Sequence, residues 1–295
     1  MMHLPQVSRW VDSVDNQLIQ YFSQKDPLTH PLDRAMEYSL LAGGKRLRPV
    51  LTLAVVDCLG GNTDSAIPLA LASELLHTYS LIHDDLPSMD NDDLRRGKPT
   101  NHIVFGEALA ILAGDALQSE AFRLLIDEPC PDLDLATRLA ILSDFAHAVG
   151  RNGMVGGQVM DLQQAGKQFD IERLRQLHGR KTGALIHFCV RLGARLGRAN
   201  AREMAALDTY GHALGLLFQV TDDILDLEAE SSVLGKTAGK DQDQDKATFP
   251  KLLGLEGAKA FADETLSLGQ DALTSLERDC KLLSDIAEYV RNRGH

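Results

Sequence analysis

Aspartates crowd into the segment HDDLPSMDNDDLRRGKPT, which spans residues 83–100. Its acids are Asp84, Asp85, Asp90, Asp92 and Asp93. Apolar residues recur at helical spacing over residues 69–82, so the first of these acids should lie at the C-terminal end of a helix, where the helix dipole is already negative. A bound cation would replace this repulsion with attraction, which makes the segment a candidate metal site.

The spacing between Asp84 and Asp90 requires the helix to stop. Six residues apart on a straight helix, the two side chains would point roughly 120° away from one another. Pro87 lies between them, and proline does not continue a helix because it lacks the N–H group and its ring collides with the preceding turn. We therefore expect the residues around Pro87 to loop out and bring Asp90 back beside Asp84.

A second aspartate segment, TDDILD, carries Asp222, Asp223 and Asp226 at the end of another long apolar stretch. Asp222 and Asp226 are four residues apart and share one face of the expected helix. Carboxylates without a neighbouring His or Cys suit hard cations, and Mg²⁺ combines one or two carboxylates with the phosphates of a substrate. Either segment alone would indicate a solvated acidic face, but two of them, each followed by basic residues, favour bound metal.

Lysine and arginine side chains near both segments supply ligands for phosphate. Arginine offers a planar fork and lysine a flexible charge. They are Arg95, Arg96 and Lys98 after the first segment, Lys236, Lys240 and Lys246 after the second, and Lys45, Arg46 and Arg48 in the turn GGKRLRP. The formal net charge is nevertheless −12, which argues against a general nucleic-acid binder because such a protein needs a basic face. The pattern indicates a small anionic ligand that is recruited through metal.

Helices are expected to position all of these groups. Apolar residues recur at helical spacing from Val7 to Phe22 and over residues 69–82, 108–126, 133–149, 184–196 and 204–227. Glycines and prolines mark the breaks, at residues 43–44, 60–61, 129–131, 150–157 and 235–239. The gaps are short and no internal repeat is present, so the sequence predicts an all-α fold in a single domain over residues 1–295.

The four cysteines, Cys58, Cys130, Cys189 and Cys280, are far apart and lack paired metal-site spacing. We expect free or buried thiols rather than a zinc site or a disulfide framework. No stretch reaches the ~18 uncharged apolar residues of a membrane span. Residues 1–10 also lack a basic region leading into an apolar run, as a secretory signal requires. A cytoplasmic location is therefore expected.

Several motifs match one enzyme family in order and spacing from about residue 30 to residue 255. They are DDLPSMD with DLRRGKPTNH, DDILD, GGKRLRP and GKTAGKDQDQDKATFP. Together they closely resemble the bacterial short-chain trans-prenyltransferases, within the family of trans-polyprenyl diphosphate synthases. The resemblance implies a bundle of roughly ten or more helices around a central cavity, the isoprenoid synthase fold, normally in a homodimer. It places the two aspartate motifs across the cavity mouth from one another.

The reaction implied by this resemblance joins isoprenoid diphosphates. Isopentenyl diphosphate would be added to dimethylallyl diphosphate and then to geranyl diphosphate, giving (2E,6E)-farnesyl diphosphate by ionisation, condensation and elimination. Three Mg²⁺ ions would assist. No residue stands out as a dedicated base, so the released diphosphate is expected to accept the proton.

The resemblance also assigns roles residue by residue. Asp84 and Asp90 would hold two Mg²⁺ ions and Asp222 the third, with support from Asp85, Asp223 and Asp226. The allylic diphosphate would be bound by Arg95, Lys181 and Lys236. The diphosphate of isopentenyl diphosphate would be bound in the turn that contains Gly44, by Lys45, Arg48, His77 and Arg96. Thr182 and Gln219 would face the developing carbocation, and Lys246 would help to close the site.

Some of these residues have simpler interpretations. His77 lies seven residues before Asp84 and so on the same helix face, which favours a ligand role over that of a core histidine. Without the resemblance, Lys181–Thr182 would more simply begin a helix with a capping threonine, and Gln219 could be a satisfied core amide. Gln158 and Asp161 in GGQVMDL are expected to be structural.

Tyr79 is the expected limit on product length. It lies five residues before Asp84 and therefore about 7.5 Å deeper along the helix. An aromatic residue here resembles the enzymes that make farnesyl diphosphate, and we expect the Tyr79 ring to form the cavity floor. The alternative is a tyrosine packed between helices.

Three other functions compete with this one. A geranylgeranyl diphosphate synthase shares the motifs and the chemistry, and only the cavity floor distinguishes it. A terpene cyclase needs no second diphosphate pocket, which Lys45, Arg48 and Arg96 are expected to provide. A non-catalytic binding subunit would have lost an aspartate motif, and both are intact here.

Overall fold

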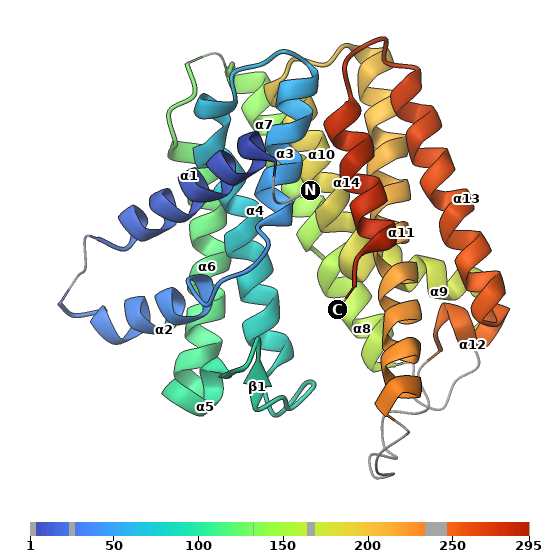
Figure 1. Cartoon of the computed structure of the whole chain (residues 1–295). Helices are drawn as coiled ribbons and strands as arrows, with labels where there is room; N and C mark the ends of the chain where they lie inside the picture. The colour runs from blue at the N-terminus through green and yellow to red at the C-terminus, as the bar shows by residue number, and fades with distance from the viewer. Residues whose placement is uncertain (1–3, 24–26, 132, 164–168, 234–246, 295) are drawn as a thin grey trace. The chain divides into compact units, whose positions relative to one another are not determined.

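The computed structural model describes residues 4–23, 27–131, 133–163, 169–233 and 247–294 (Figure 1). Helices make up 77% of the described residues, and the strands within these ranges are two residues long each, so the predicted all-α class is confirmed. The chain divides into two compact units. The first comprises Met1–Asp57 and Asn62–Leu142, and the second Cys58–Gly61 and Ser143–His295. The single domain expected over residues 1–295 stays a prediction.

The first unit is built around helix α4 (Thr63–Asp84), which contacts α1, α2 and α6. Its N-terminus is capped by the Asn62 side chain, which accepts hydrogen bonds from the N–H groups of Asp64 and Ser65. The helix is buried on most sides, as expected of a central element. The other elements are α1 (Pro5–Tyr21), α2 (His30–Leu40), α3 (Leu47–Cys58), β1 (Leu94–Arg95), β2 (Lys98–Pro99), α5 (Asn101–Phe105), α6 (Glu107–Asp127) and the start of α7 (Leu135–Val149).

A buried arginine fixes the basic turn of this unit. Arg46 is 3% exposed and adopts a left-handed backbone with a φ of 47°. Its guanidinium donates to Asp15 at 2.8 Å, to Glu74 at 2.8 Å and to the carbonyl of Leu40 at 2.9 Å. Three helices are thereby tied to the segment GGKRLRP. Arg46 is therefore a structural residue that holds this segment in place.

The second unit is built around α11 (Ala201–Val233), which contacts α10, α13 and α14. A Cβ on Gly215 of this helix would lie 2.7 Å from the Cα of Gly183, so glycine is required for the close approach between them. The remaining elements are α8 (Met154–Leu162), α9 (Ile171–His178), the π-helical turn η1 (Gly179–Gly183), α10 (Ala184–Leu196), α12 (Phe249–Leu253), α13 (Leu255–Thr274) and α14 (Lys281–Asn292).

Most predicted helices are present, with shifted ends. The helix over residues 184–196 begins and ends as predicted. The break expected over residues 150–157 is shorter, because α8 already begins at Met154 and includes two of the glycines. The break at residues 235–239 lies outside the described residues. None of the described helices has the length and hydropathy needed to cross a membrane.

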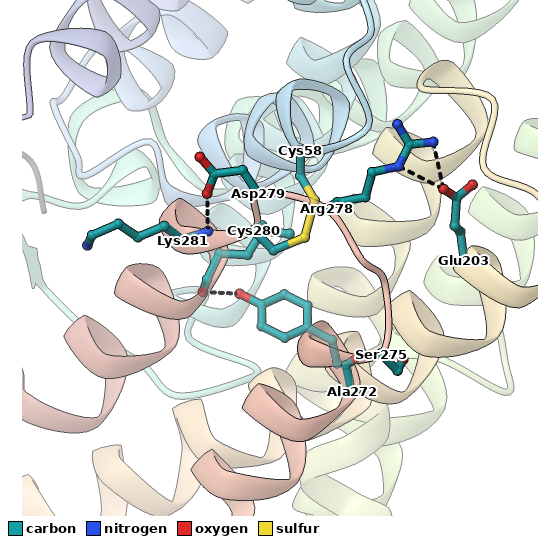
Figure 2. Close-up of a disulfide and its surroundings, with 10 residues drawn as sticks. Cys58, Glu203, Ala272, Ser275, Arg278, Asp279, Cys280 and Lys281 are labelled. Atoms are coloured by element: carbon teal, nitrogen blue, oxygen red, sulfur yellow. Dashed lines mark hydrogen bonds and ion pairs between the residues drawn. A yellow bond between two sulfur atoms is a disulfide. The ribbon is translucent and has the colours of Figure 1, made fainter.

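The expectation of free thiols is wrong for two of the cysteines. Cys58 and Cys280 form a disulfide within the second unit (Figure 2). They are 222 residues apart in sequence, and their Cα atoms are 5.2 Å apart. Cys280 directly precedes α14, so the disulfide holds the start of that helix. Cys130 and Cys189 are in no disulfide of the described residues, and Cys189 is buried, as predicted for thiols.

Replacing Arg46 with methionine should strongly destabilise the protein. Glu74 would be left buried and unpaired, and breaking such a buried pair costs about 3–5 kcal/mol of unfolding free energy. Urea denaturation followed by circular dichroism would measure the loss. The double variant Arg46→Met with Glu74→Leu removes both charges and should recover much of it. A single variant as stable as the parent would show that the network does not hold the turn.

Candidate functional site

The first aspartate segment begins where α4 ends. Asp84 is the last residue of the helix and Asp85 caps it. The chain then turns at Pro87, and the N–H of Asp90 donates to the carbonyl of Asp84 at 2.8 Å. Asp92 is tied in the same way to Asp85, at 3.2 Å. The loop therefore returns Asp90 to Asp84, and this prediction is confirmed.

A short hairpin follows and positions two arginines. Leu94 pairs with Pro99 and Arg95 with Lys98, which leaves Arg96 and Gly97 as the two-residue turn. Both turn residues are left-handed, with φ values of 53° and 75°. This is the backbone of a type I′ turn, which matches the twist of a hairpin. The turn sends two adjacent arginines to different partners.

Arg95 binds the second acid of the aspartate segment. Its Nε lies 2.7 Å from Oδ1 of Asp85 and its Nη2 lies 2.6 Å from the same oxygen. Asp85 is 3% exposed, and burial raises its pKa, while the hydrogen bonds and charge of Arg95 act in the opposite direction. The two side chains that were predicted to support metal and diphosphate are thus bonded to each other in this structure.

A group of positive charges surrounds the Gly43–Gly44 turn. Arg96 donates a hydrogen bond to the carbonyl of Gly43, and a Cβ on Gly44 would lie 2.8 Å from its guanidinium. Burial, followed by the charges of Arg48 and Arg96, lowers the pKa of His77 well below its ordinary value, so its imidazole is neutral at pH 7. The structure therefore brings together Arg48, Arg96 and His77, three of the residues that were predicted to bind one diphosphate. The mutual repulsion of the two arginines would be relieved by an anion.

Tyr79 lies one turn before the aspartates on α4. Its half-buried ring meets that of His83 edge-on, with centroids 4.7 Å apart. Burial, then the charges of Asp115 and Asp84, raise the pKa of Tyr79. The hydroxyl is therefore a neutral group near two carboxylates. Its role as a cavity floor stays a prediction.

The second aspartate segment lies inside α11 rather than at its end, because the helix continues to Val233. Asp222 is half-buried and accepts a hydrogen bond of 2.6 Å from Arg293, while Asp226 is exposed. Asp223 has a different partner from Asp222. Its Oδ2 accepts from the N–H of Phe249 at 2.9 Å, which ties α11 to the start of α12.

Asp223 has a strongly perturbed pKa. Burial, together with the carboxylates of Asp222 and Asp226, raises its pKa to about 7 against the opposing hydrogen bond from the N–H of Phe249. His178 lies beside it, with Nε2 3.8 Å from Oδ2 of Asp223, and stacks on the ring of Phe249. Burial lowers the pKa of His178 to about 4, so this imidazole is neutral. Sequence analysis missed His178, although it precedes Lys181 by three residues.

The segment GRKTG forms η1, a five-residue π-helical turn between α9 and α10. The interpretation of Lys181–Thr182 as a capped helix start is therefore wrong. Lys181 donates to Oδ2 of Asp161 at 2.7 Å, and Thr182 donates to Oε1 of Gln219 at 2.5 Å. The structure thus brings together the two oxygens predicted to face the carbocation. Asp161, expected to be structural, orients a predicted substrate ligand.

A close helix approach holds η1 in place. A Cβ on Gly157 of α8 would lie 2.2 Å from the backbone nitrogen of Lys181. Any larger residue would push the two segments apart. π-Helical turns are often found at functional sites because they redirect side chains within a helix. The remaining predicted ligands of this region, Lys236, Lys240 and Lys246, lie outside the described residues.

The chemistry of the aspartates fits Mg²⁺. Asp84 and Asp222 are half-buried and Asp90 is exposed, so each can offer oxygen to a ligand of its own unit. Within the described ranges, no three His, Cys, Asp or Glu side chains converge into a complete metal cage. Mg²⁺ does not need one, because it is commonly held by one or two carboxylates together with substrate phosphates.

Comparisons with known proteins agree on one family. The family model described as polyprenyl synthetase matches residues 29–280. The farnesyl diphosphate synthase of Bacillus subtilis is 44% identical over 283 residues, which cover 96% of this chain and 95% of the relative. The heterodimeric geranylgeranyl pyrophosphate synthase large subunit 1 of Arabidopsis thaliana is 47% identical over 275 residues, which cover 90% of this chain and 74% of the relative.

Solved structures show the same likeness. The crystal structure of an FPP/GFPP synthase from Zymomonas mobilis matches with a TM-score of 0.87 and 37% sequence identity, and the match covers 96% of both chains. The likeness extends over nearly the whole chain in sequence and in structure.

Inorganic diphosphate should raise the pKa of His77. An anion beside Arg48 and Arg96 would offset the positive charge that disfavours the imidazolium, so protonation would begin at a higher pH than in the free protein. By linkage, diphosphate should also bind more tightly as the pH falls. NMR titration of the imidazole Cε1–H signals would measure the shift, with His77→Gln to assign the signal. A pKa that stays constant on saturation would contradict this pocket.

Proposed function

Because the chain belongs to the polyprenyl synthetase family, we propose that it is a prenyltransferase that makes farnesyl diphosphate from isopentenyl, dimethylallyl and geranyl diphosphates. The fold is the isoprenoid synthase fold. The observation that carries the proposal is the basic group at the Gly43–Gly44 turn. It supports a diphosphate pocket separate from the aspartates, which a condensing enzyme needs and a cyclase does not.

Two sets of cations would divide the substrates between them. In this proposal, the diphosphate of isopentenyl diphosphate is bound by Lys45, Arg48, His77 and Arg96. The diphosphate of the allylic substrate is bound by Arg95, Lys181 and Lys236. The neutral imidazole of His77 contributes an N–H donor rather than a charge. Arg95 keeps a fixed orientation because Asp85 binds two nitrogens, Nε and Nη2, on one edge of its guanidinium.

The aspartates would hold the metal. Asp84 and Asp90 bind two Mg²⁺ ions and Asp222 the third, with Asp85, Asp223 and Asp226 in support. Magnesium bound there supplies Lewis-acid stabilisation of the departing diphosphate. Asp223 supports indirectly, because its carboxylate is committed to Phe249 and holds α12 against α11.

Residues of the second unit would stabilise the allylic cation. Thr182 and Gln219 are bonded to one another, so their oxygen atoms have a fixed direction. Oxygen dipoles that are oriented before the reaction stabilise positive charge without reorganisation. The second condensation follows the same steps with geranyl diphosphate as the allylic substrate. Lys246 is proposed to help close the site, and a cytoplasmic homodimer stays a prediction from the sequence.

The product assay tests this function directly. The protein, given labelled isopentenyl diphosphate, dimethylallyl diphosphate and Mg²⁺, should yield mainly the fifteen-carbon product after dephosphorylation and chromatography. Asp84→Ala should retain less than a tenth of the activity, a loss of more than about 1.4 kcal/mol in transition-state binding. Asp271→Ala, which removes an exposed acid on α13, serves as the matched control. A main product of twenty carbons, or a hydrocarbon from the allylic substrate alone, would contradict the proposal.

Replacing Tyr79 with alanine should lengthen the product. Tyr79 lies five residues before Asp84 on α4, about 7.5 Å along the helix, and removal of its ring would open the channel to twenty carbons or more. Chromatography of the dephosphorylated products measures the shift. Tyr79→Phe keeps the ring and should still stop at fifteen carbons. If the alanine variant also stopped there, the floor would lie on another helix.

A further inference from the structure

An arginine just after α14 contacts the second aspartate segment. Nη2 of Arg293 lies 2.6 Å from Oδ1 of Asp222 and 3.1 Å from the carbonyl of Phe218, one turn earlier on α11. Its guanidinium carbon lies 3.8 Å from the centre of the Phe218 ring. The Arg293 side chain is only 11% exposed. These contacts place a fixed cation on the aspartate that is proposed to bind the third metal.

Helix α14, which precedes this arginine, is held in place by several contacts. Its start is held by the disulfide at Cys280 (Figure 2). The hydroxyl of Tyr210 also holds it, because it donates to the carbonyl of Leu283 at 2.8 Å. Leu283, Ile286 and Val290 are fully buried. The helix also runs beside α11 (Figure 1). The position of Arg293 is therefore set by the packing of the second unit.

We propose that Arg293 and Mg²⁺ compete for Asp222, so that the arginine neutralises this carboxylate until metal displaces it. The inference rests on the metal role of Asp222 in the proposed function. A guanidinium nitrogen 2.6 Å from Oδ1 takes the space of a metal, which would bond to that oxygen at about 2.0–2.1 Å. Like charges on the metal and the guanidinium would also repel each other.

The contact is built so that it can be released. Nε of Arg293 is buried and makes no hydrogen bond within the described residues. A buried donor without an acceptor costs free energy, which weakens the bound position relative to one in water. Asp222 itself is 46% exposed, so a hydrated metal can reach it from solvent. Metal binding would then free the guanidinium from α11.

Metal affinity tests the competition. Binding of Mn²⁺ in the presence of inorganic diphosphate is followed by the EPR signal of free Mn²⁺, for the full chain and its variants. Arg293→Gln should bind the metal about two- to fivefold more tightly, the factor expected when one partly exposed ion pair is removed. Arg291→Gln removes a charge two residues away that pairs with Asp263 instead, and should leave the affinity unchanged.

Hydrogen exchange provides a second readout. Amides of residues 290–294 should exchange faster when Mg²⁺ and diphosphate are present, because Arg293 no longer holds this end of α14. Unchanged or weaker metal binding in Arg293→Gln, or slower exchange on adding metal, would overturn the inference. Asp222→Asn separates this from the proposed function. If that variant lost metal while Arg293→Gln did not gain it, only the competition would fail, whereas normal binding by Asp222→Asn would remove the metal assignment itself.

Discussion

Repulsion between like charges is the constraint on which the rest of this structure depends. The proposed binding of diphosphate and metal needs several cations close together and several carboxylates close together. Neither cluster is stable unless other residues of the protein hold it in place. In the first unit this residue is the buried Arg46, whose bonds to Asp15 and Glu74 fix the turn that carries Lys45. Protein groups on three helices satisfy Arg46, so it anchors the turn and is not a candidate ligand for diphosphate. The segment GGKRLRP thus contains both the anchor, Arg46, and Lys45, which the proposed function assigns to diphosphate.

Acids and bases of the candidate site are paired with one another in this structure. The pairs are Asp85 with Arg95, Asp161 with Lys181, and Asp222 with Arg293. Each joins a carboxylate to a cation of the same unit, so each charge is partly neutralised before metal or diphosphate arrives. Such pairing lowers the free-energy cost of burying these charges. A ligand that displaces one partner must therefore interact with the remaining charge more strongly than that partner did.

Sequence reasoning succeeded where the relevant geometry was local. The return of Asp90 to Asp84 followed from the six-residue spacing and from Pro87, because both act within two turns of one helix. It failed where the partners are distant. Nothing in the sequence pairs Cys58 with Cys280, or brings Arg293 to Asp222, because these contacts depend on how whole helices pack. Thr182 and Gln219 were found only through family resemblance, and their mutual bond required the structure.

Product length is the part of the function that overall similarity decides least. A plant geranylgeranyl pyrophosphate synthase subunit is 47% identical to this chain, and a bacterial farnesyl diphosphate synthase is 44% identical. The residues that are proposed to bind diphosphate and metal serve the same chemistry irrespective of the length of the product. The length of the product depends instead on how far the growing chain can extend from the aspartates before a side chain stops it. If Tyr79 forms the floor, as proposed, this single ring on α4 outweighs differences in identity spread over the whole chain.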